Sequence, residues 1–246
     1  MLKDVSKSVS VSGDAALSIE KNHSILILIA FIDSNISNFR KYYLKNNEPD
    51  DENKISFHLV NFFNSCLMGF SEYTPVRFSF VKNPAQQVSL RETDIGVVIL
   101  SLNSPSDTII EFESKRLSDS SNNTEYVYGK RGGIERFKRN LHGSHLPICG
   151  MFGYVQSKTI PYWVKKINEW IKDLGTNNPE NSIDWSAQDE RLIMLIKFKN
   201  SQKFQSSNSR TNNGEIILFH YMLNLKRLNQ VKRAKNSFKG KTSARQ

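Results

Sequence analysis

The sequence predicts a mixed α/β protein in which helices cover a β-sheet. Segments that alternate between apolar and polar residues, or are apolar throughout, are interleaved with segments whose apolar residues recur every three or four positions. Of the 246 residues, 38% are hydrophobic and 11% aromatic, which is enough to bury a sizeable core. No internal repeat is present in the sequence. We therefore expect a single domain over residues 1–225, with its core at about 46–175, and a basic tail over residues 226–246.

The first part of the chain is expected to carry one strand and two helices. Residues 22–33 are predicted to form a buried strand, because their central run ILILIAFI is entirely apolar. Residues 34–46 suit a short helix that begins at a polar cap. Residues 52–68 are predicted to form an amphipathic helix, since their apolar side chains recur at helical spacing.

Three strands should follow, the last two joined as a hairpin. Residues 76–83 alternate as a strand does, and residues 93–102 are mostly apolar, which is typical of a central strand. Residues 103–107, NSPSD, have the composition of a turn. Residues 108–117, TIIEFESKRL, are then expected to run antiparallel to the preceding strand.

The remaining segments continue the alternation of helices and strands. We expect a flexible loop at 118–125, a helix at 133–141, a strand at 147–157, a helix at 161–175, and strands at 190–199 and 215–225 joined by a polar loop at 200–214. The glycines of the strand at 147–157 indicate that another part of the protein approaches closely there.

The net charge of +10 is concentrated at one end of the chain. Residues 226–246 contain eight basic and no acidic residues, which leaves +2 for residues 1–225. Such a tail favours contact with a polyanion, most often nucleic acid, and we take Lys232, Arg233 and Lys235 as candidate contacts. The alternative interpretation is a terminus that is simply solvated.

Cysteine content and hydropathy favour a cytoplasmic protein. Two cysteines make neither a disulfide framework nor a zinc finger. The longest apolar run, residues 25–32, is too short to span a bilayer, and no secretion signal is recognisable, so we expect no membrane association. Fingerprints for dinucleotides, Walker-type phosphate loops and serine hydrolases are missing from the sequence.

Acidic residues at the ends of the predicted hairpin indicate a metal site. Asp94 opens one strand and Glu113 lies near the end of the next, so an antiparallel hairpin brings the two carboxylates together. Carboxylate oxygens are preferred ligands of Mg²⁺. Lys115 projects from the same face as Glu113 and could orient a water molecule. The alternatives are a turn cap for Asp94 and a solvated strand edge, with weak cross-strand ion pairs, for Glu113 and Lys115.

This pattern resembles the signature of the PD-(D/E)xK nuclease superfamily, which has the restriction-endonuclease-like fold. The resemblance implies that Asp94 and Glu113 bind Mg²⁺, that Lys115 assists the attacking water, and that Glu52, at the start of a helix, completes the site. On its own, Glu52 also fits a helix-start acid that interacts with the helix dipole. The resemblance covers about residues 52–156. Thr93 stands where the family's proline would be, and Glu111 is a competing carboxylate on the same face.

A second stretch, residues 126–145, has the features of a phosphate-binding surface. Lys130 and Arg131 precede two glycines at a predicted helix start, where free backbone N–H groups favour anions. Arg136 and Lys138 continue the basic surface along that helix, and the resemblance places the helix near the active site. The alternative is a flexible loop followed by a solvated basic helix face.

Together these features predict a Mg²⁺-dependent nuclease, with Mn²⁺ as a substitute metal, of restriction-endonuclease-like α/β fold with a mixed β-sheet flanked by helices. The resemblance implies DNA as the substrate, and by analogy a role in phage defence, a mobile element or repair, as a homodimer or with a partner subunit of a defence complex. The alternatives are a non-catalytic nucleic-acid-binding protein and an interaction subunit of the same fold.

Overall fold

The computed structural model describes residues 13–45, 51–70, 77–84, 93–100, 108–129, 131–177, 183–186, 190–211 and 214–227. Its elements in chain order are α1 (Gly13–Tyr43), α2 (Glu52–Phe70), β1 (Phe78–Lys82), β2 (Ile95–Ile99), β3 (Thr108–Leu117), the short 3₁₀ helix η1 (Asn123–Tyr126), α3 (Gly133–Lys138), β4 (Ile148–Val155), α4 (Ile160–Thr176), β5 (Ile193–Lys197), β6 (Ser201–Ser209) and β7 (Glu215–Asn224). The predicted mixed α/β class is confirmed.

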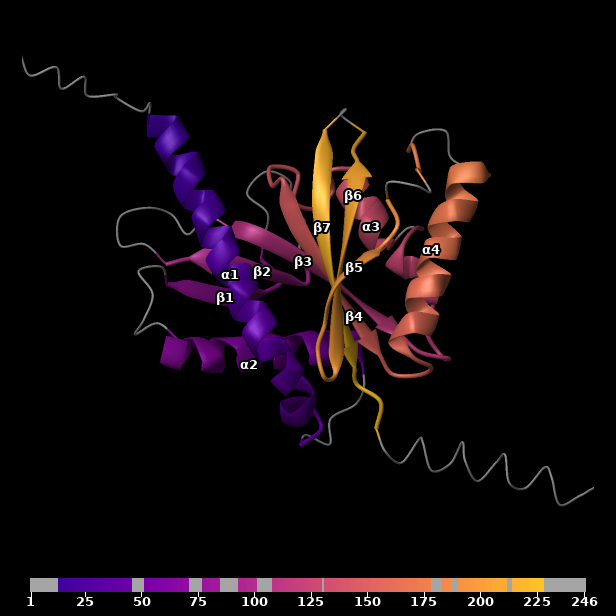
Figure 1. Cartoon of the computed structure of the whole chain (residues 1–246), viewed down its shortest axis with the longest axis horizontal. Helices are drawn as coiled ribbons and strands as arrows, with labels where there is room; N and C mark the ends of the chain where they lie inside the picture. The colour runs from indigo at the N-terminus through magenta and orange to yellow at the C-terminus, as the bar shows by residue number, and fades with distance from the viewer. Residues whose placement is uncertain are drawn as a thin grey trace, which may run out of the picture.

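All of these strands belong to one twisted sheet with the order β1-β2-β3-β4-β7-β6-β5. The strands β1, β2 and β3 are antiparallel neighbours, β4 runs parallel to both β3 and β7, and β6 and β5 continue the sheet antiparallel. Helices α1 and α2 cover one face, while α3 and α4 lie on the other side (Figure 1). The antiparallel pairing of β2 with β3 is confirmed, whereas the predicted turn at 103–107 lies outside the described residues.

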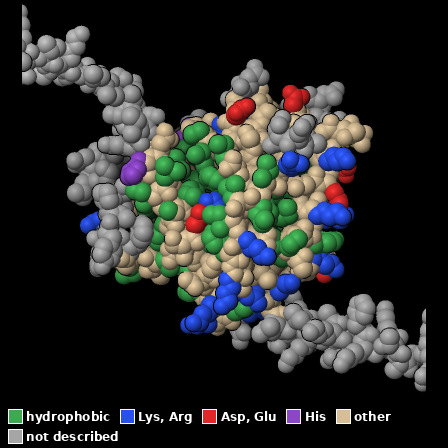
Figure 2. All heavy atoms as spheres, viewed as in Figure 1, with side chains coloured by type: hydrophobic (Ala, Val, Ile, Leu, Met, Phe, Trp, Pro, Cys, Tyr) green, Lys and Arg blue, Asp and Glu red, His purple; other side chains and the backbone are tan. Residues whose placement is uncertain are grey.

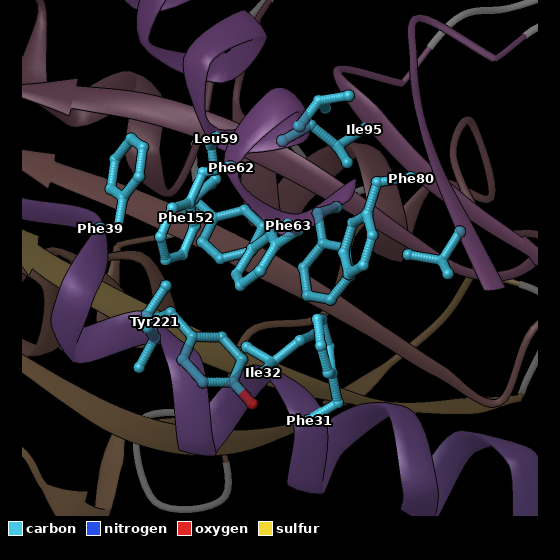
Figure 3. Packing of buried hydrophobic residues seen from close by; sticks show 14 of the residues in the cluster. Phe31, Ile32, Phe39, Leu59, Phe62, Phe63, Phe80, Ile95, Phe152 and Tyr221 are labelled. Atoms are coloured by element: carbon cyan, nitrogen blue, oxygen red, sulfur yellow. The ribbon is translucent and has the colours of Figure 1, made fainter. Parts of the chain in front are cut away.

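Aromatic side chains fill the layer between the sheet and the first two helices (Figure 3). The rings of Phe63 on α2 and Phe80 on β1 stack with centroids 4.6 Å apart, and those of Phe112 and Phe152 stack at 4.7 Å. A Cβ at Gly150 would lie 2.3 Å from the Phe112 ring, which explains the glycine in β4. Burial of each such ring contributes about 1.5–3 kcal/mol, so this layer fixes α2 against the sheet.

Helix α4 covers the opposite face and follows the predicted pattern. Thr159 caps its start, accepting a hydrogen bond from the Tyr162 N–H at 3.2 Å. Trp163, Ile167 and Ile171 form its buried stripe. The sheet therefore has a hydrophobic core on each of its two faces.

The predicted strand at 22–33 is wrong, because these residues lie inside the long helix α1. Among the described side chains, the buried ones follow a helical stripe through Leu28, Ile32, Ile36 and Phe39, while Leu26 is 68% exposed. The run ILILIAFI is apolar at every position, so it fits both periods, and packing on the sheet selects the helix. Of the described residues, no helix is both long enough and apolar enough to cross a membrane.

The predicted loop at 200–214 is also wrong, because it contains the strand β6, which pairs with β5 on one side and β7 on the other. Two of its buried polar side chains have partners on other elements. The Lys203 ammonium donates to Asp33 of α1 at 2.8 Å, and Ser206 shares a 2.8 Å hydrogen bond with His220 of β7. These long-range contacts override the low β-propensity of the segment.

Two further expectations change in detail. The predicted loop at 118–125 is organised by hydrogen bonds, since the Asn123 side chain bonds both the N–H and the C=O of Ser118, and it leads into η1. The helix predicted at 133–141 ends at Lys138. Cys66 and Cys149 are both free thiols.

Candidate active site

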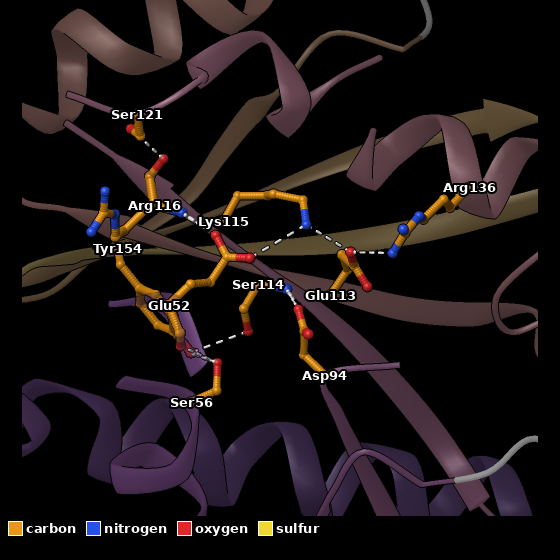
Figure 4. A network of polar contacts seen from close by, with 10 residues as sticks. All are labelled: Glu52, Ser56, Asp94, Glu113, Ser114, Lys115, Arg116, Ser121, Arg136 and Tyr154. Carbon is orange, nitrogen blue, oxygen red and sulfur yellow. Dashed lines mark hydrogen bonds and ion pairs between the residues drawn. The ribbon is translucent and has the colours of Figure 1, made fainter. Parts of the chain in front are cut away.

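The candidate site forms where β3 extends beyond β2. The pairing of these strands begins at Ile95 opposite Phe112, so from Glu113 onward β3 has a neighbouring strand only on the β4 side. Beyond the end of β2, two side-chain carboxylates form hydrogen bonds with the backbone of β3 in place of a neighbouring strand. Asp94 Oδ2 accepts a hydrogen bond from the Ser114 N–H at 2.6 Å, and Glu52 Oε2 accepts one from the Arg116 N–H at 2.8 Å (Figure 4).

The register brings Asp94 and Glu113 to neighbouring positions. The last pair, Ile95 with Phe112, places Asp94, which directly precedes β2, next to Glu113, which follows Phe112 in β3. The two carboxylates are close enough for the charge of Glu113 to raise the pKa of Asp94. Glu52 reaches the same place from the first turn of α2.

Two cations converge on a single oxygen of Glu113. Lys115 Nζ donates to Glu113 Oε1 at 2.7 Å, and the Arg136 guanidinium of α3 donates to the same oxygen at 2.8 Å. Lys115 Nζ also lies 3.6 Å from Glu52 Oε1, so the ammonium is held between two carboxylates (Figure 4). The side chain of Glu113 is 2% exposed, and its second oxygen, Oε2, has no hydrogen-bond partner among the described residues.

Burial and crowding of charge shift the acids of the site. Burial raises the pKa of Asp94 to about 6, the charge of Glu113 adds to this shift, and Lys115 opposes it. Burial also raises the pKa of Glu52, against the opposing effect of Lys115. For Lys115, burial lowers the pKa, but the carboxylates of Glu113, Glu52 and Asp94 outweigh it, and the pKa is raised. Lys115 therefore stays cationic, while Asp94 titrates close to neutral pH.

A hydrogen-bonded layer that was not predicted from the sequence lies next to the site. The buried Tyr154 hydroxyl of β4 shares hydrogen bonds with Ser114 at 3.1 Å and Ser56 at 3.0 Å. Ser56 in turn donates to the Glu52 carbonyl, so this layer ties the first turn of α2 to β3 and β4. Burial raises the pKa of Tyr154, which stays neutral. The sequence signal for this layer is the spacing of four residues between Glu52 and Ser56, which places both on the same face of a helix.

The competing carboxylate Glu111 serves another purpose. Its Oε2 accepts a hydrogen bond from the Gly143 N–H at 2.9 Å, so it supports the segment that leads into β4. Glu113 is the carboxylate that contacts Lys115 and Arg136.

The predicted phosphate-contacting residues separate into three groups. Arg136 lies in the site, and Arg131 is exposed just before α3. Lys138 is fully buried, where its ammonium pairs with Glu190 and lies over the Trp185 ring. A side chain without exposed surface has no atom to offer to a phosphate, so Lys138 does not belong to such a surface. Lys130, Lys232, Arg233 and Lys235 lie outside the described residues.

The three predicted metal ligands do not form a closed cluster. Among the residues that the structure describes, no three His, Cys, Asp or Glu side chains are grouped so as to hold a metal ion between them. Lys115 Nζ lies between the carboxylates of Glu52 and Glu113. The charge of Asp94 contributes to the raised pKa of Glu52, so these two acids also interact.

Comparison with known proteins identifies no relative of this chain. No family model, curated protein or solved structure matches the chain. The interpretation of the site therefore rests on its own residues.

Proposed function

We propose that the chain is a Mg²⁺-dependent nuclease that hydrolyses phosphodiester bonds of DNA and has the restriction-endonuclease-like fold of the PD-(D/E)xK superfamily. The observation that carries this proposal is the register of β2 and β3, which sets Asp94 beside Glu113 while Lys115 contacts the latter. The expected order of elements supports it as well, since a helix, three antiparallel strands, a helix and a fourth strand lie around the site.

The donor set fits a hard divalent cation. Mg²⁺ keeps several of its waters and is commonly held by one or two carboxylates together with substrate phosphates, so a closed cage of three acids is not required. Glu113 Oε2, buried and without a partner among the described residues, is an oxygen available to such an ion, and Asp94 is the second ligand. Glu52 would contact the ion through water. When bound, the metal lowers the pKa of a water molecule and stabilises charge on the phosphate.

The two cations have distinct positions in this proposal. Lys115 lies between Glu52 and Glu113, where a compact ammonium can hold the attacking water against the phosphate. The Arg136 side chain is 26% exposed, so its guanidinium can neutralise a phosphate that lies over Glu113.

A second function is favoured by a different observation. Asp94 and Glu52 accept hydrogen bonds from the N–H groups at the free edge of β3, and Lys115 and Arg136 neutralise Glu113. These contacts also suit a non-catalytic protein of the same fold, in which the acids are structural and basic surfaces bind nucleic acid or an acidic partner.

Metal-dependent nicking of supercoiled plasmid separates the two functions. We expect the protein to nick plasmid with Mg²⁺ or Mn²⁺ and not in EDTA. Asp94→Asn and Lys115→Met should each lower the rate by about 10²-fold or more, with folding checked by circular dichroism. The matched control Glu169→Gln removes a carboxylate on the exposed side of α4 and should leave the rate unchanged. Binding of DNA without cutting in either metal would establish the non-catalytic function instead.

A further inference from the structure

The strands β3, β4 and β7 end at one edge of the sheet, which we call the carboxyl edge. Leu117 of β3 pairs with Val155 of β4, and Val155 pairs with Asn224 of β7. This edge lies just beyond Lys115 of the candidate site. Since neighbouring strands are about 4.8 Å apart, β7 ends about 10 Å from β3. The chain therefore leaves the sheet close to the site.

Four cations from three separate segments converge at this edge, and we call them the basic collar: Arg40, Lys158, Lys226 and Arg227. Arg40, near the end of α1, donates to the carbonyls of Asn224 and Lys226. Lys226 Nζ donates to the carbonyl of Lys158, which precedes α4. The Arg227 guanidinium lies 5.3 Å from the centre of the Tyr43 ring. These contacts hold the charged groups of Arg40, Lys226 and Arg227 against the body of the protein.

Among the residues that the structure describes, Asp119 is an acidic neighbour of the collar. It lies 3.5 Å from Lys158 Nζ, but the two side chains are 65% and 49% exposed, so this pair offsets the charge only weakly. Figure 2 shows Lys and Arg side chains gathered on the lower part of the molecule, near the point where the C-terminal grey segment begins. In the sequence, six further basic residues and no acidic residue follow Arg227. A concentration of positive charge of this kind attracts a polyanion.

We propose that DNA bound at the candidate site extends across the carboxyl edge, with its backbone phosphates on the basic collar. This inference rests on the proposed function, which supplies DNA as the ligand, and it adds the direction in which the DNA leaves the site.

Binding of a fluorescent 20-base-pair DNA duplex in EDTA, followed by anisotropy at several salt concentrations, tests the collar without any cutting. The collar variant is Lys158→Gln/Lys226→Gln/Arg227→Gln; Arg40 stays because it holds the backbone. Since each phosphate contact contributes about 0.9 to the slope of log affinity against log salt, the variant should lose about two to three units of slope and about tenfold or more in affinity at 100 mM salt.

The control variant Lys165→Gln/Lys172→Gln/Arg191→Gln removes the same charge from exposed positions of α4 and of the segment that precedes β5. It should change affinity by less than about threefold, because it leaves the collar intact. Asp119→Asn should tighten binding, and this variant covers the case in which the triple collar variant does not fold.

Three results would each overturn the inference. They are an equal loss of DNA affinity in the collar and control variants, no loss of DNA affinity in the collar variant, and no DNA binding by the wild-type protein. Cutting is scored separately with Mg²⁺. If the wild-type protein cuts DNA but its binding does not depend on the collar, the nuclease proposal holds and the collar inference fails. If binding depends on the collar but the protein never cuts DNA, the collar inference holds and the nuclease proposal fails.

Discussion

At the scale of single residues, the site combines acids that repel one another with cations that hold them in place. Asp94, which directly precedes β2, and Glu113 of β3 are each held by contacts with neighbouring groups. Lys115, the Ser114 N–H and Arg136 stabilise the ionised form of Asp94, whereas burial and the charge of Glu113 oppose it. The balance leaves Asp94 poorly solvated in its ionised form, which is a common condition of functional acids.

The shifted pKa of Asp94 predicts a specific pH dependence of stability. Its pKa rises from 3.8 to about 6 on folding, so the folded state holds the proton more tightly than the unfolded state between these values. The contribution of Asp94 to the free energy of unfolding is fully present below pH 3.8 and is lost as the pH rises through 6. The loss amounts to about 3 kcal/mol. Asp94→Asn keeps an oxygen for the Ser114 N–H but carries no charge. We expect it to be more stable than wild type at pH 8 and similar at pH 4.

Urea denaturation of both proteins in EDTA, from pH 4 to pH 8, measures this difference. Because groups far from Asp94 are unchanged, the difference between the two curves reports the titration of Asp94 together with the neighbours to which its charge couples. A variant that is less stable than wild type at pH 8 would contradict the prediction, and would mean that the contacts of the ionised carboxylate outweigh its burial.

At the scale of elements, buried polar contacts attach α1 to the far half of the sheet. Asp33 of α1 accepts hydrogen bonds at 2.8 Å from Lys203 of β6 and from the Tyr221 hydroxyl of β7. Lys203 is 5% exposed and also lies over the Phe219 ring at 4.7 Å. A helix predicted to be a strand and a strand predicted to be a loop thus hold each other in place.

Removing Asp33 leaves the Lys203 ammonium buried without its carboxylate. We expect Asp33→Ala to lower the free energy of unfolding by about 3–5 kcal/mol, because an uncompensated buried charge is costly. In Asp33→Ala/Lys203→Met the charge is gone as well, and most of the loss should be recovered. A double-mutant cycle by chemical denaturation measures the coupling, and additive effects of the two changes would refute it.

At the scale of the whole molecule, β5 lies at an edge of the sheet that the described residues form. Its residues Ile193, Met194, Leu195 and Ile196 are 38–57% exposed, and β6 pairs with only one side of the strand. Exposed apolar edge strands are templates for pairing with other chains, and many proteins protect them with a charged residue or a covering segment. Lys197 is the charged residue within β5, at its end.

We expect the protein to self-associate in a concentration-dependent manner through β5. Leu195→Lys places a charge in the middle of the edge and should shift the association to higher concentration, as measured by sedimentation velocity. Leu26→Lys is the matched control, since Leu26 is 68% exposed on α1 and away from any strand. Equal effects of both changes would argue for general apolar attraction instead of edge pairing.

Much of the sheet half that carries the site could be predicted because its signals are local. The helix that begins at Glu52, the strand limits of β3 and the stripe of α4 follow from residues adjacent in the chain. The meeting of Asp94 with Glu113 follows in the same way, since a short connection between antiparallel strands leaves few alternative registers.

The sequence by itself determined the mixed α/β class and the helices and strands around the candidate site, and it predicted Asp94, Glu113 and Lys115 as candidate site residues. Only the tertiary structure decided that residues 22–33 are helical, that the polar residues of β6 form a strand, that Arg136 reaches Glu113 and that Lys138 is buried. The physical reason is the range of the interactions. Periodicity records which face of a segment is apolar, whereas the partner of a buried charge is chosen by segments that meet only after the chain has folded.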